Sequence, residues 1–324
     1  MPAGLTARAL RDPALPLAEA LDPGRMAEPL ARAAGLPSAP RDVRADVVNH
    51  KPGRRCVIVY AAGGRRLFGK LYARPVLAGR AHGWIEAVRA ATAGPGEPPA
   101  VPAPRAVVPE LGLALHAHAP GTDLCRALGS PAVTLAGRWL WRLHATAPPP
   151  GVKAEPLTHE LVRLDWWCAD ARPSLRRRAA TMLDDTHERL RALATSLPDR
   201  PAVLVHRDYY QENLLWDGRR VSVLDFDQLA CGDPALDVAH FQAHLEALAY
   251  RRTRRTQTYA AAVARFTAAA PPVDDDRLRL YRAHTFLKLA ATEVQRRRDG
   301  WRALAETWTE LAHRETAPKG VWSP

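Results

Sequence analysis

Residues 203–227, VLVHRDYYQENLLWDGRRVSVLDFD, concentrate side chains that can do acid–base and metal chemistry. Asp208 follows an expected buried strand, Asn213 lies in the loop after it, and Asp225 ends the next expected strand. One short loop and one hairpin are enough to bring these two carboxylates and this amide together on a rigid scaffold. Hard oxygen ligands that converge in this way suit Mg²⁺, which keeps several waters and pairs with phosphates. The segment therefore predicts a catalytic loop with a magnesium site.

The order of these residues also fits a known catalytic pattern. The tripeptide HRD at 206–208, the later Asn213 and the tripeptide DFD at 225–227 match the kinase signature H-R-D-x-x-x-x-N followed by D-F-x. The alternative is a chance HRD tripeptide and a strand that merely ends in solvent. Because both motifs occur in register, with a matching spacer and hairpin length, we favour the catalytic interpretation.

A lysine and a glutamate upstream have the spacing of a phosphate-binding pair. Lys70 is expected in the apolar strand LFGKLYA, in a chain with only five lysines among its 46 basic residues. A compact ammonium on a flexible stem can reach a nucleotide phosphate. Glu86, in the helix expected next, could pair with Lys70 and hold it extended. The alternatives are an edge-strand lysine in solvent and a glutamate on an exposed helix face.

The elements that must position these residues form two groups. Three extended segments from Val43, separated by Pro52-Gly53 and by Gly63-Gly64, predict an antiparallel meander. A helix over 80–93 and two more strands follow. We therefore expect an α+β fold with a small antiparallel sheet and one packed helix in its first part.

The rest of the chain is expected to be mainly helical. Apolar spacing predicts helices around 135–143 and 174–197, and two short buried strands flank the catalytic loop. Three or four helices are expected over 235–311, with breaks at Pro271-Pro272 and Asp299-Gly300. The predicted organisation is an N-terminal extension interrupted by prolines (1–40), a β-rich lobe (41–119) and a helical lobe (120–324).

Charge raises the question of a nucleic-acid or anionic-membrane partner. The 324 residues carry a formal net charge of +12 and a pI near 10.1. The basic clusters lie in helical patterns without interleaved aromatic residues, which is typical of solvated helix faces. We attribute the charge to an arginine-rich composition and expect no specific nucleic-acid partner, with a basic nucleic-acid-binding protein as the alternative.

Cysteine spacing and hydropathy bear on the compartment. The four cysteines are widely separated, form no CxxC pair and are expected to be reduced. Charged residues and prolines interrupt the N-terminus, and no uncharged run of 18 residues occurs. We therefore expect a cytoplasmic protein without a membrane partner.

With these motifs, the chain resembles the aminoglycoside phosphotransferase and choline kinase-like family, small-molecule kinases built on the protein-kinase fold. The resemblance covers about 43–248, and HRDYYQEN…LDFDQLACGDPALDVA is its most specific part. The sequence GDPALD at 232–237 is similar to the family's G-D-P-x-x-D signature, and no A-P-E segment follows Asp225 as a protein kinase would require. The resemblance implies a bilobal, protein-kinase-like arrangement.

The resemblance also implies a role for each candidate residue. Asp237 would brace the catalytic loop, and His206 is expected to organise that loop rather than carry protons. The remaining roles are a catalytic base (Asp208), two magnesium ligands (Asn213 and Asp225), a phosphate-binding lysine (Lys70) with its partner (Glu86), and a hinge for adenine at 116–119, which includes His118.

Two features depart from the family pattern. The family often has glycine at the position of Arg207, whereas protein kinases have arginine there. Arg207 is expected to form a local ion pair. The segment HKPGRRC at 50–56 replaces a G-x-G-x-x-G loop. Its Pro-Gly turn, with Lys51, Arg54 and Arg55, could cap the triphosphate through charge and backbone amides. The alternative is a plain hairpin turn.

The resulting functional hypothesis is transfer of the γ-phosphoryl group of ATP, or GTP, to a hydroxyl of a small molecule such as an aminoglycoside, amino alcohol or sugar. A catalytically silent nucleotide-binding relative is an alternative. The acceptor pocket is sought at LDWWCAD, 164–170, where Trp166 and Trp167 could stack on a sugar and Asp165 or Asp170 could meet an amine. The alternative there is ordinary core tryptophans with solvated acids.

Overall fold

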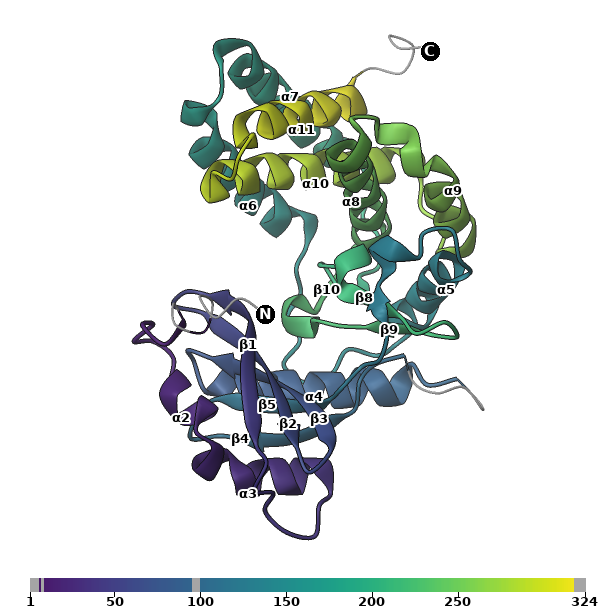
Figure 1. Cartoon of the computed structure of the whole chain (residues 1–324). Helices are drawn as coiled ribbons and strands as arrows, with labels where there is room; N and C mark the ends of the chain where they lie inside the picture. Colours follow the sequence, from purple (N-terminus) through teal and green to yellow (C-terminus); the bar gives the residue numbers. More distant parts are fainter. Residues whose placement is uncertain (1–5, 7–8, 95–99, 318–324) are drawn as a thin grey trace. The chain divides into compact units, whose positions relative to one another are not determined.

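The structure, a computed structural model, describes residue 6 and residues 9–94 and 100–317. The chain divides into two compact units. The first unit comprises 1–121 together with 222–227, and the second comprises 122–221 together with 228–324. The short segment with Asp225 thus belongs to the first unit, although the sequence around it belongs to the second. Both units are drawn in Figure 1.

The first unit contains a five-stranded antiparallel sheet. Its order is β1-β2-β3-β5-β4, which confirms the expected meander followed by two strands. Helix α4 (Val76–Ala91) connects the two sets and begins earlier than the expected residue 80. The strands are β1 (Arg44–Lys51), β2 (Arg55–Ala62), β3 (Arg65–Tyr72), β4 (Pro104–Val108) and β5 (Leu113–Ala117).

The two faces of this sheet pack against different helices. Because side chains alternate along a strand, Ile58 and Leu71 point to one face and Tyr72 and Ala114 to the other. Helix α4 packs on the face with Tyr72 and Ala114. Helices α2 (Leu17–Leu21) and α3 (Pro23–Ala34) supply the opposite core, as Figure 1 shows for α3. The described part of 1–40 therefore packs into the core of the first unit.

A tyrosine and a glycine fit the N-terminal segment to the sheet. The Tyr60 hydroxyl donates a 2.7 Å hydrogen bond to the carbonyl of Ala20 in α2. A Cβ at Gly69 on the neighbouring strand would lie 2.5 Å from the Tyr60 ring. Only glycine leaves room for this ring, so β3 and the N-terminal segment are matched in shape.

Local sequence signals explain why helix α3 forms although it contains two prolines. The carboxylate of Asp22 accepts a hydrogen bond from the Arg25 amide, which caps the helix, and Pro23 occupies the first helical position. Gly35 ends the helix with φ of 65°. Pro29 is accommodated inside the helix and is buried. Short helical stretches around 15–21 and 26–34 were expected here, and α2 and α3 confirm them, with Pro23 starting α3 and Pro29 lying inside it.

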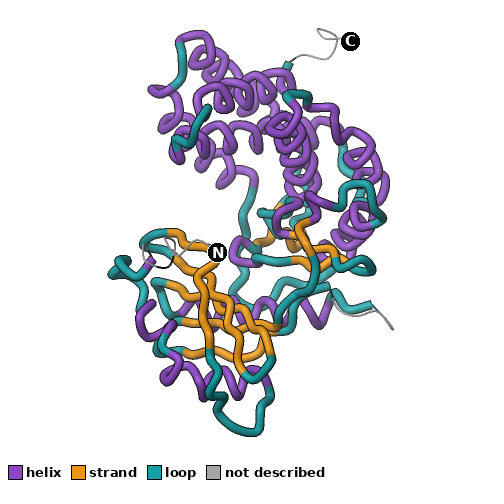
Figure 2. Tube along the Cα trace, viewed as in Figure 1, coloured by secondary structure: helices purple, strands orange, loops and turns teal. Residues whose placement is uncertain are grey.

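The second unit is built mainly of helices (Figure 2). Helix α10 (Asp275–Arg296) lies in its core, and the helices α6, α7, α8 and α11 all pack against it. Three or four helices were expected over 235–311, and the structure has four there, with breaks at both predicted positions. The helices are α5 (Ala132–His144), α6 (Leu157–Ala171), α7 (Arg177–Ser196), α8 (Ala235–Thr253), α9 (Ala260–Ala269) and α11 (Trp301–Thr316).

Short strands frame the catalytic loop of this unit. Strand β7 (Val203–Val205) pairs antiparallel with β10 (Ala230–Gly232) and leads directly into the loop. Strand β8 (Leu214–Trp216) leaves the loop and pairs with β6 (Thr122–Asp123). The boundary between the two units falls inside β9 (Val221–Val223).

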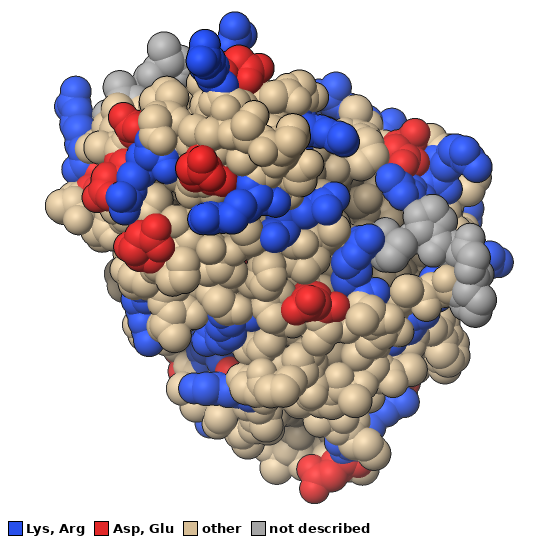
Figure 3. Space-filling model, turned by 90° about the horizontal axis from the view of Figure 1, so that it is seen from below, with Lys and Arg blue, Asp and Glu red and all other residues tan. Residues whose placement is uncertain are grey.

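Helix hydropathy, cysteine pairing and surface charge bear on the expected compartment and partners. No helix in 9–94 or 100–317 is both long and apolar enough to cross a membrane. All four cysteines are free. On the face shown in Figure 3, basic side chains occur in separate groups with acidic side chains among them.

Candidate active site

A buried carboxylate braces the catalytic loop. Asp237, at the start of α8, is fully buried and accepts hydrogen bonds of 2.8 Å from the backbone amides of His206 and Arg207. His144 contributes a third contact to this carboxylate, at 3.2 Å. Burial alone would raise the pKa of Asp237, but these partners lower it, so the group is ionised. The bracing role expected for Asp237 is confirmed.

The loop is also anchored by its own aromatic residues. His206 is buried, and its Nδ1 accepts a 3.3 Å hydrogen bond from the amide of Asp208. The hydroxyl of Tyr209 donates to the carbonyl of Ala136 at 2.8 Å, and its ring stacks on Trp139. These contacts fix the backbone on both sides of Asp208, and they confirm the expected organising role of His206.

Arg207 adopts an unusual backbone conformation and forms a buried ion pair. Its φ of 64° is in the left-handed region, which explains why glycine suits this position in the family it resembles. Its guanidinium lies 2.8 Å from Glu160 on α6, as expected for a local ion pair. Arg163 lies 2.7 Å from the same carboxylate. Burial opposes ionisation of Glu160, but His284 and the two arginines outweigh it and lower its pKa to about 2.

Asp208 and Asn213 lie together in the second unit. The amide Nδ2 of Asn213 donates a 2.9 Å hydrogen bond to the carbonyl of Asp208, and Oδ1 of Asn213 is the oxygen that can ligate a metal ion. The Asp208 carboxylate lies 3.6 Å from Nε2 of His240 and 3.7 Å from Nζ of Lys288. Burial would raise the pKa of Asp208, but these two neighbours hold it well below its usual range. Asp208 is therefore an ionised proton acceptor.

The first unit holds a second group of charged residues. Asp225, with φ of 64°, accepts hydrogen bonds from Lys70 at 2.7 Å and from Arg55 at 2.8 Å. Asp227 contacts the same two cations, and its carboxylate accepts a 2.8 Å hydrogen bond from the Tyr72 hydroxyl. Burial opposes ionisation of Asp225, but Lys70 and Arg55 lower its pKa. Two cations thus balance two carboxylates.

Lys70 lies where a functional lysine was expected. Strand β3 is the centre of the sheet, which excludes the alternative of an edge strand. The Lys70 side chain is 13% exposed and reaches Asp225, 155 residues further along the chain. The sequence motif and the lysine are therefore joined within one unit.

The prediction that Lys70 pairs with Glu86 is wrong. Helix α4 buries Ala81, Trp84 and Val88 against the sheet, and Glu86 is exposed. Two residues after Trp84, Glu86 is rotated about 200° around the helix axis. Lys70 instead pairs with Asp225 and Asp227.

The turn at 50–56 is closed by a carboxylate from the N-terminal segment. Oδ2 of Asp12 accepts a hydrogen bond from the amide of Gly53 and contacts Nε2 of His50, both at 2.8 Å. These contacts, with the Gly53 amide first, lower the pKa of Asp12. Arg54 is exposed at the same turn. The Gly53 amide therefore already has a hydrogen-bond acceptor, which favours the alternative of a plain hairpin turn. The Arg54 side chain remains exposed to solvent.

His118 follows β5 and stacks on Phe68, with ring centroids 5.4 Å apart. Phe68 and Lys70 are two residues apart in β3, so their side chains share one face of the sheet. Burial lowers the pKa of His118, and Arg66 adds to this effect. The neutral ring and Phe68 offer an aromatic surface beside the expected hinge.

The expected acceptor segment, 164–170, is largely engaged elsewhere. Asp165 pairs with His187 at 2.7 Å and with Arg191 at 2.6 Å, and Asp170 accepts from Gln295 at 3.0 Å. Trp166 is 62% exposed. Trp167 lies near the group around Asp208: Nζ of Lys288, which is 3.7 Å from the Asp208 carboxylate, lies 5.9 Å from the Trp167 ring centroid.

The donor set suits Mg²⁺ in type. Carboxylate and amide oxygens from Asp225 and Asn213 are the ligands that Mg²⁺ prefers, and this ion takes few protein ligands because water and phosphates complete its shell. Among the described residues, no three His, Cys, Asp or Glu side chains are grouped to hold a metal by themselves. Asp225 belongs to the first unit and Asn213 to the second.

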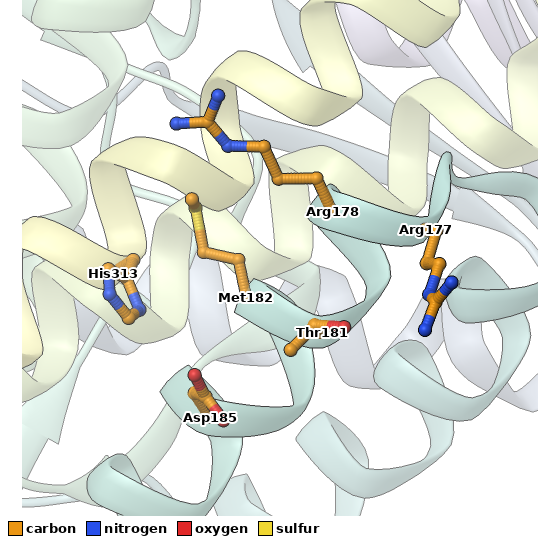
Figure 4. A pocket seen from close by; sticks show the side chains of 6 residues that line it. All are labelled: Arg177, Arg178, Thr181, Met182, Asp185 and His313. Carbon is orange, nitrogen blue, oxygen red and sulfur yellow. The ribbon is translucent and has the colours of Figure 1, made fainter.

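Sequence reasoning did not identify Asp227, Lys288 or His240 as site residues. The scarcity of lysine, which pointed to Lys70, applies equally to Lys288. A surface hollow on α7 and α11 lies apart from all these groups (Figure 4). Its lining residues are Arg177, Arg178, Thr181, Met182, Asp185 and His313.

The fold and these residues define a class of protein: residues 54–281 match the phosphotransferase enzyme family. The chain belongs to this family. None of the curated protein sequences compared with the chain matches it.

Solved structures show the same fold at low sequence identity. A thermostable mutant of aminoglycoside phosphotransferase APH(4)-Ia is 18% identical with a TM-score of 0.59, covering 90% of this chain and 99% of its own. A choline/ethanolamine kinase family protein from Mesorhizobium loti is 16% identical, with a TM-score of 0.57 and coverages of 90% and 95%. Spectinomycin phosphotransferase APH(9)-Ia, solved with ADP and spectinomycin, is 12% identical, with a TM-score of 0.55 and coverages of 84% and 93%. The expected bilobal, protein-kinase-like α+β fold is confirmed.

Proposed function

We propose that this phosphotransferase moves the γ-phosphoryl group of ATP, or GTP, to a hydroxyl of a small molecule. The observation that carries the proposal is the ionised carboxylate of Asp208 on a loop that Asp237 braces through two backbone amides. The presence of ADP or a nucleotide analogue in structural relatives supports a nucleotide donor. The four free cysteines support a reducing, cytoplasmic setting.

In the proposed step, Asp208 accepts the proton of the acceptor hydroxyl. The hydroxyl oxygen forms a bond to the γ-phosphorus, the bond from that phosphorus to the β,γ-bridging oxygen breaks, and the nucleoside diphosphate leaves. Such a transfer depends mainly on positioning and on electrostatic stabilisation. The fixed backbone around Asp208 supplies the positioning.

The remaining site residues receive roles in nucleotide binding. Lys70 would bind the phosphates, and Asp225 and Asn213 would hold Mg²⁺. When bound, Mg²⁺ supplies positive charge that neutralises the phosphate oxygens. His118, stacked on Phe68, lies at the expected hinge for the purine base. Arg54 would add charge near the triphosphate from its exposed position.

Two matched substitutions test this assignment. Asp208→Asn keeps the side-chain shape but removes the proton acceptor, so turnover should fall by about 10²- to 10⁴-fold while Mg²⁺-dependent ATP binding survives. Asp225→Asn removes a charged oxygen ligand, so Mg²⁺-dependent ATP affinity should weaken together with turnover. Raised Mg²⁺ should restore part of this second loss. Calorimetric titration of ATP, with and without Mg²⁺, gives the binding readout.

The turnover readout is a screen with labelled ATP against aminoglycosides, amino alcohols, sugars and nucleosides. Asp217→Asn is the control, because Asp217 closes a turn through the amides of Arg219 and Arg220. This variant should behave as the wild type does. Loss of ATP binding in Asp208→Asn, with normal binding and turnover in Asp225→Asn, would show that the two roles are assigned wrongly. A wild-type protein that neither binds Mg²⁺-ATP nor transfers phosphate would contradict the proposed function.

A further inference from the structure

The surroundings of Asp208 in the second unit contain a basic residue and two histidines. Lys288 on α10 lies 3.7 Å from the Asp208 carboxylate, and His240 on α8 lies 3.6 Å from it. The ring centroid of His244, one turn after His240, lies 4.4 Å from that of His240 and 4.3 Å from that of Tyr210. These residues, Tyr210, His240, His244 and Lys288, are called the acceptor cluster below.

Carboxylates on the helices around this cluster already have partners. An ammonium-rich acceptor would need unengaged carboxylates beside Asp208, because burial of an unpaired charge is costly. Instead, the acids of α6 and α8 and the acid of α10 nearest Lys288 accept hydrogen bonds or pair with cations within the unit. They are Glu160 with Arg207, Asp165 with Arg191, Asp170 with Gln295, Asp237 with the loop amides, Glu246 with Arg282, and Glu293 with Arg251.

A hydrogen bond to Thr285 indicates which ring nitrogen of His240 carries a proton. The Thr285 hydroxyl donates to the Tyr281 carbonyl at 2.7 Å, so it accepts from Nδ1 of His240 at 3.3 Å. The other ring nitrogen, Nε2, is then a hydrogen-bond acceptor when the ring is neutral. Burial lowers the pKa of His240, with Lys288 adding to the effect, and the ring is 1% exposed. Nε2 also lies 3.6 Å from the Asp208 carboxylate, so a proton on this nitrogen is directed at Asp208.

Two buried ring nitrogens of the cluster lack a short hydrogen bond. Nε2 of His244 has no hydrogen-bond partner within the described part of the chain, and Nε2 of His240 has only its 3.6 Å contact with Asp208. A buried polar atom without a partner costs about 1–3 kcal/mol. A bound polyhydroxylated molecule would satisfy such atoms with its hydroxyl groups. Lys288, whose side chain is 31% exposed, carries the lysine ammonium group of the cluster.

We infer that the acceptor is an anionic alcohol, with a hydroxyl at Asp208 and a carboxylate or phosphate group at Lys288. The inference rests on the proposed function and names the substrate class of the same site. Asp208 accepts a hydrogen bond from the reacting hydroxyl of the acceptor, and Nε2 of His244 is open to a second hydroxyl. Lys288 pairs with its oxyanion and discriminates against an amine at the same position.

The first test compares acceptors that differ in one group. Glycerol, glycerate, glycerol 3-phosphate and 3-amino-1,2-propanediol form one set, and glucose, glucuronate, glucose 6-phosphate and glucosamine form a second set. With Mg²⁺-ATP, an anionic member should have a kcat/KM about 10- to 100-fold above the neutral and aminated members of its set. The carboxylate and phosphate arms identify which oxyanion Lys288 holds. Preference for the aminated member, or no transfer to any anionic member, would overturn the inference.

The second test changes the cation. Lys288→Met should raise KM for the anionic acceptor more than KM for ATP and should remove most of the preference over the neutral member. Lys288→Glu should shift the preference toward the aminated member. Lys153→Met is the control, because Lys153 is an exposed lysine of the same unit. An equal effect of Lys288→Met on all members of a set, or an effect on KM for ATP alone, would assign Lys288 to the nucleotide and overturn the inference.

These outcomes are separate from failure of the proposed function. Wild-type protein that binds Mg²⁺-ATP and phosphorylates an amino alcohol refutes the anionic acceptor and keeps the phosphotransferase. Wild-type protein that does not bind Mg²⁺-ATP in calorimetry refutes the phosphotransferase itself.

Discussion

The guanidinium of Arg207 and the carboxylate of Glu160 form a buried ion pair of 2.8 Å that joins the catalytic loop to α6. Their side chains are 12% and 3% exposed. A buried pair must offset the loss of hydration of both charges, so removal of one partner costs more than the pair itself contributes. The pair therefore works as a fixed connection for the loop, and its members are the first targets for substitution.

Glu160→Gln should destabilise the protein by about 3–5 kcal/mol, because it leaves Arg207 buried without its counter-ion. Urea unfolding at neutral pH measures the change in the free energy of unfolding. Glu310→Gln provides the matched control, since Glu310 pairs with Arg314 on the exposed face of α11. That substitution should change the free energy of unfolding by no more than about 1 kcal/mol. Equal effects of the two substitutions would contradict the buried connection.

The same residue predicts a pH dependence of stability. The folded protein lowers the pKa of Glu160 from 4.5 to about 2, so the unfolded state binds a proton first as the pH falls. Stability from Glu160 is thus fully present above about pH 5 and is lost as the pH approaches about 2, with a total of about 3 kcal/mol. The difference in unfolding free energy between wild type and Glu160→Gln should shrink over this window. A difference that stays constant from pH 6 to pH 3 would refute the assignment.

Arg207→Gly and Arg207→Ala separate the ion pair from the backbone conformation. Both variants lose the guanidinium, but only alanine carries a Cβ at a φ of 64°. The left-handed conformation costs a residue with a Cβ about 1 kcal/mol, so the glycine variant should be more stable than the alanine variant by roughly that amount. Thermal unfolding of the two variants side by side measures the difference. If alanine is the more stable, the loop relaxes out of the left-handed region.

Local signals explain what the sequence predicted well. The meander of the first unit follows from two glycine turns between alternating strands, and the local sequence is enough to predict both turns. The HRD and DFD motifs carry their own spacing. Asp237 was identifiable because the GDPALD segment resembles a signature of the family.

Tertiary contacts explain what the sequence did not reveal. Helix α6 was not predicted, because its buried stripe contains a charged residue, Glu160, among apolar ones. Arg163 and Arg207 neutralise this buried carboxylate through tertiary contacts that the local sequence does not reveal. Glu86 was placed on the wrong face, because the phase of a helix depends on where it begins. Lys288 meets Asp208 across 80 residues of chain, and no local pattern records that contact.

The N-terminal helices provide a test of packing. Met26 on α3 is completely buried in the core that α2 and α3 form with the sheet. Met26→Ala should lower the free energy of unfolding by about 2–5 kcal/mol, because it removes buried apolar volume and leaves a cavity. Glu28→Ala, at an exposed position of the same helix, should change it by less than about 0.5 kcal/mol. A neutral Met26→Ala would mean that the segment is not part of the core in solution.

The charge balance around Asp225 predicts how the first unit responds to a metal ion. Arg55 and Lys70 both occupy the oxygens of Asp225, so a divalent cation must compete with them for this carboxylate. Arg55→Met removes one competitor and leaves excess negative charge, and we expect Mn²⁺, used as a paramagnetic probe in the absence of nucleotide, to bind about tenfold more tightly. Arg65→Met, at an exposed position of the same sheet, should have no effect. Adding Asp225→Asn to the Arg55→Met protein should abolish the gain. Unchanged or weaker Mn²⁺ binding in the single variant would mean that Arg55 does not compete with the metal at Asp225.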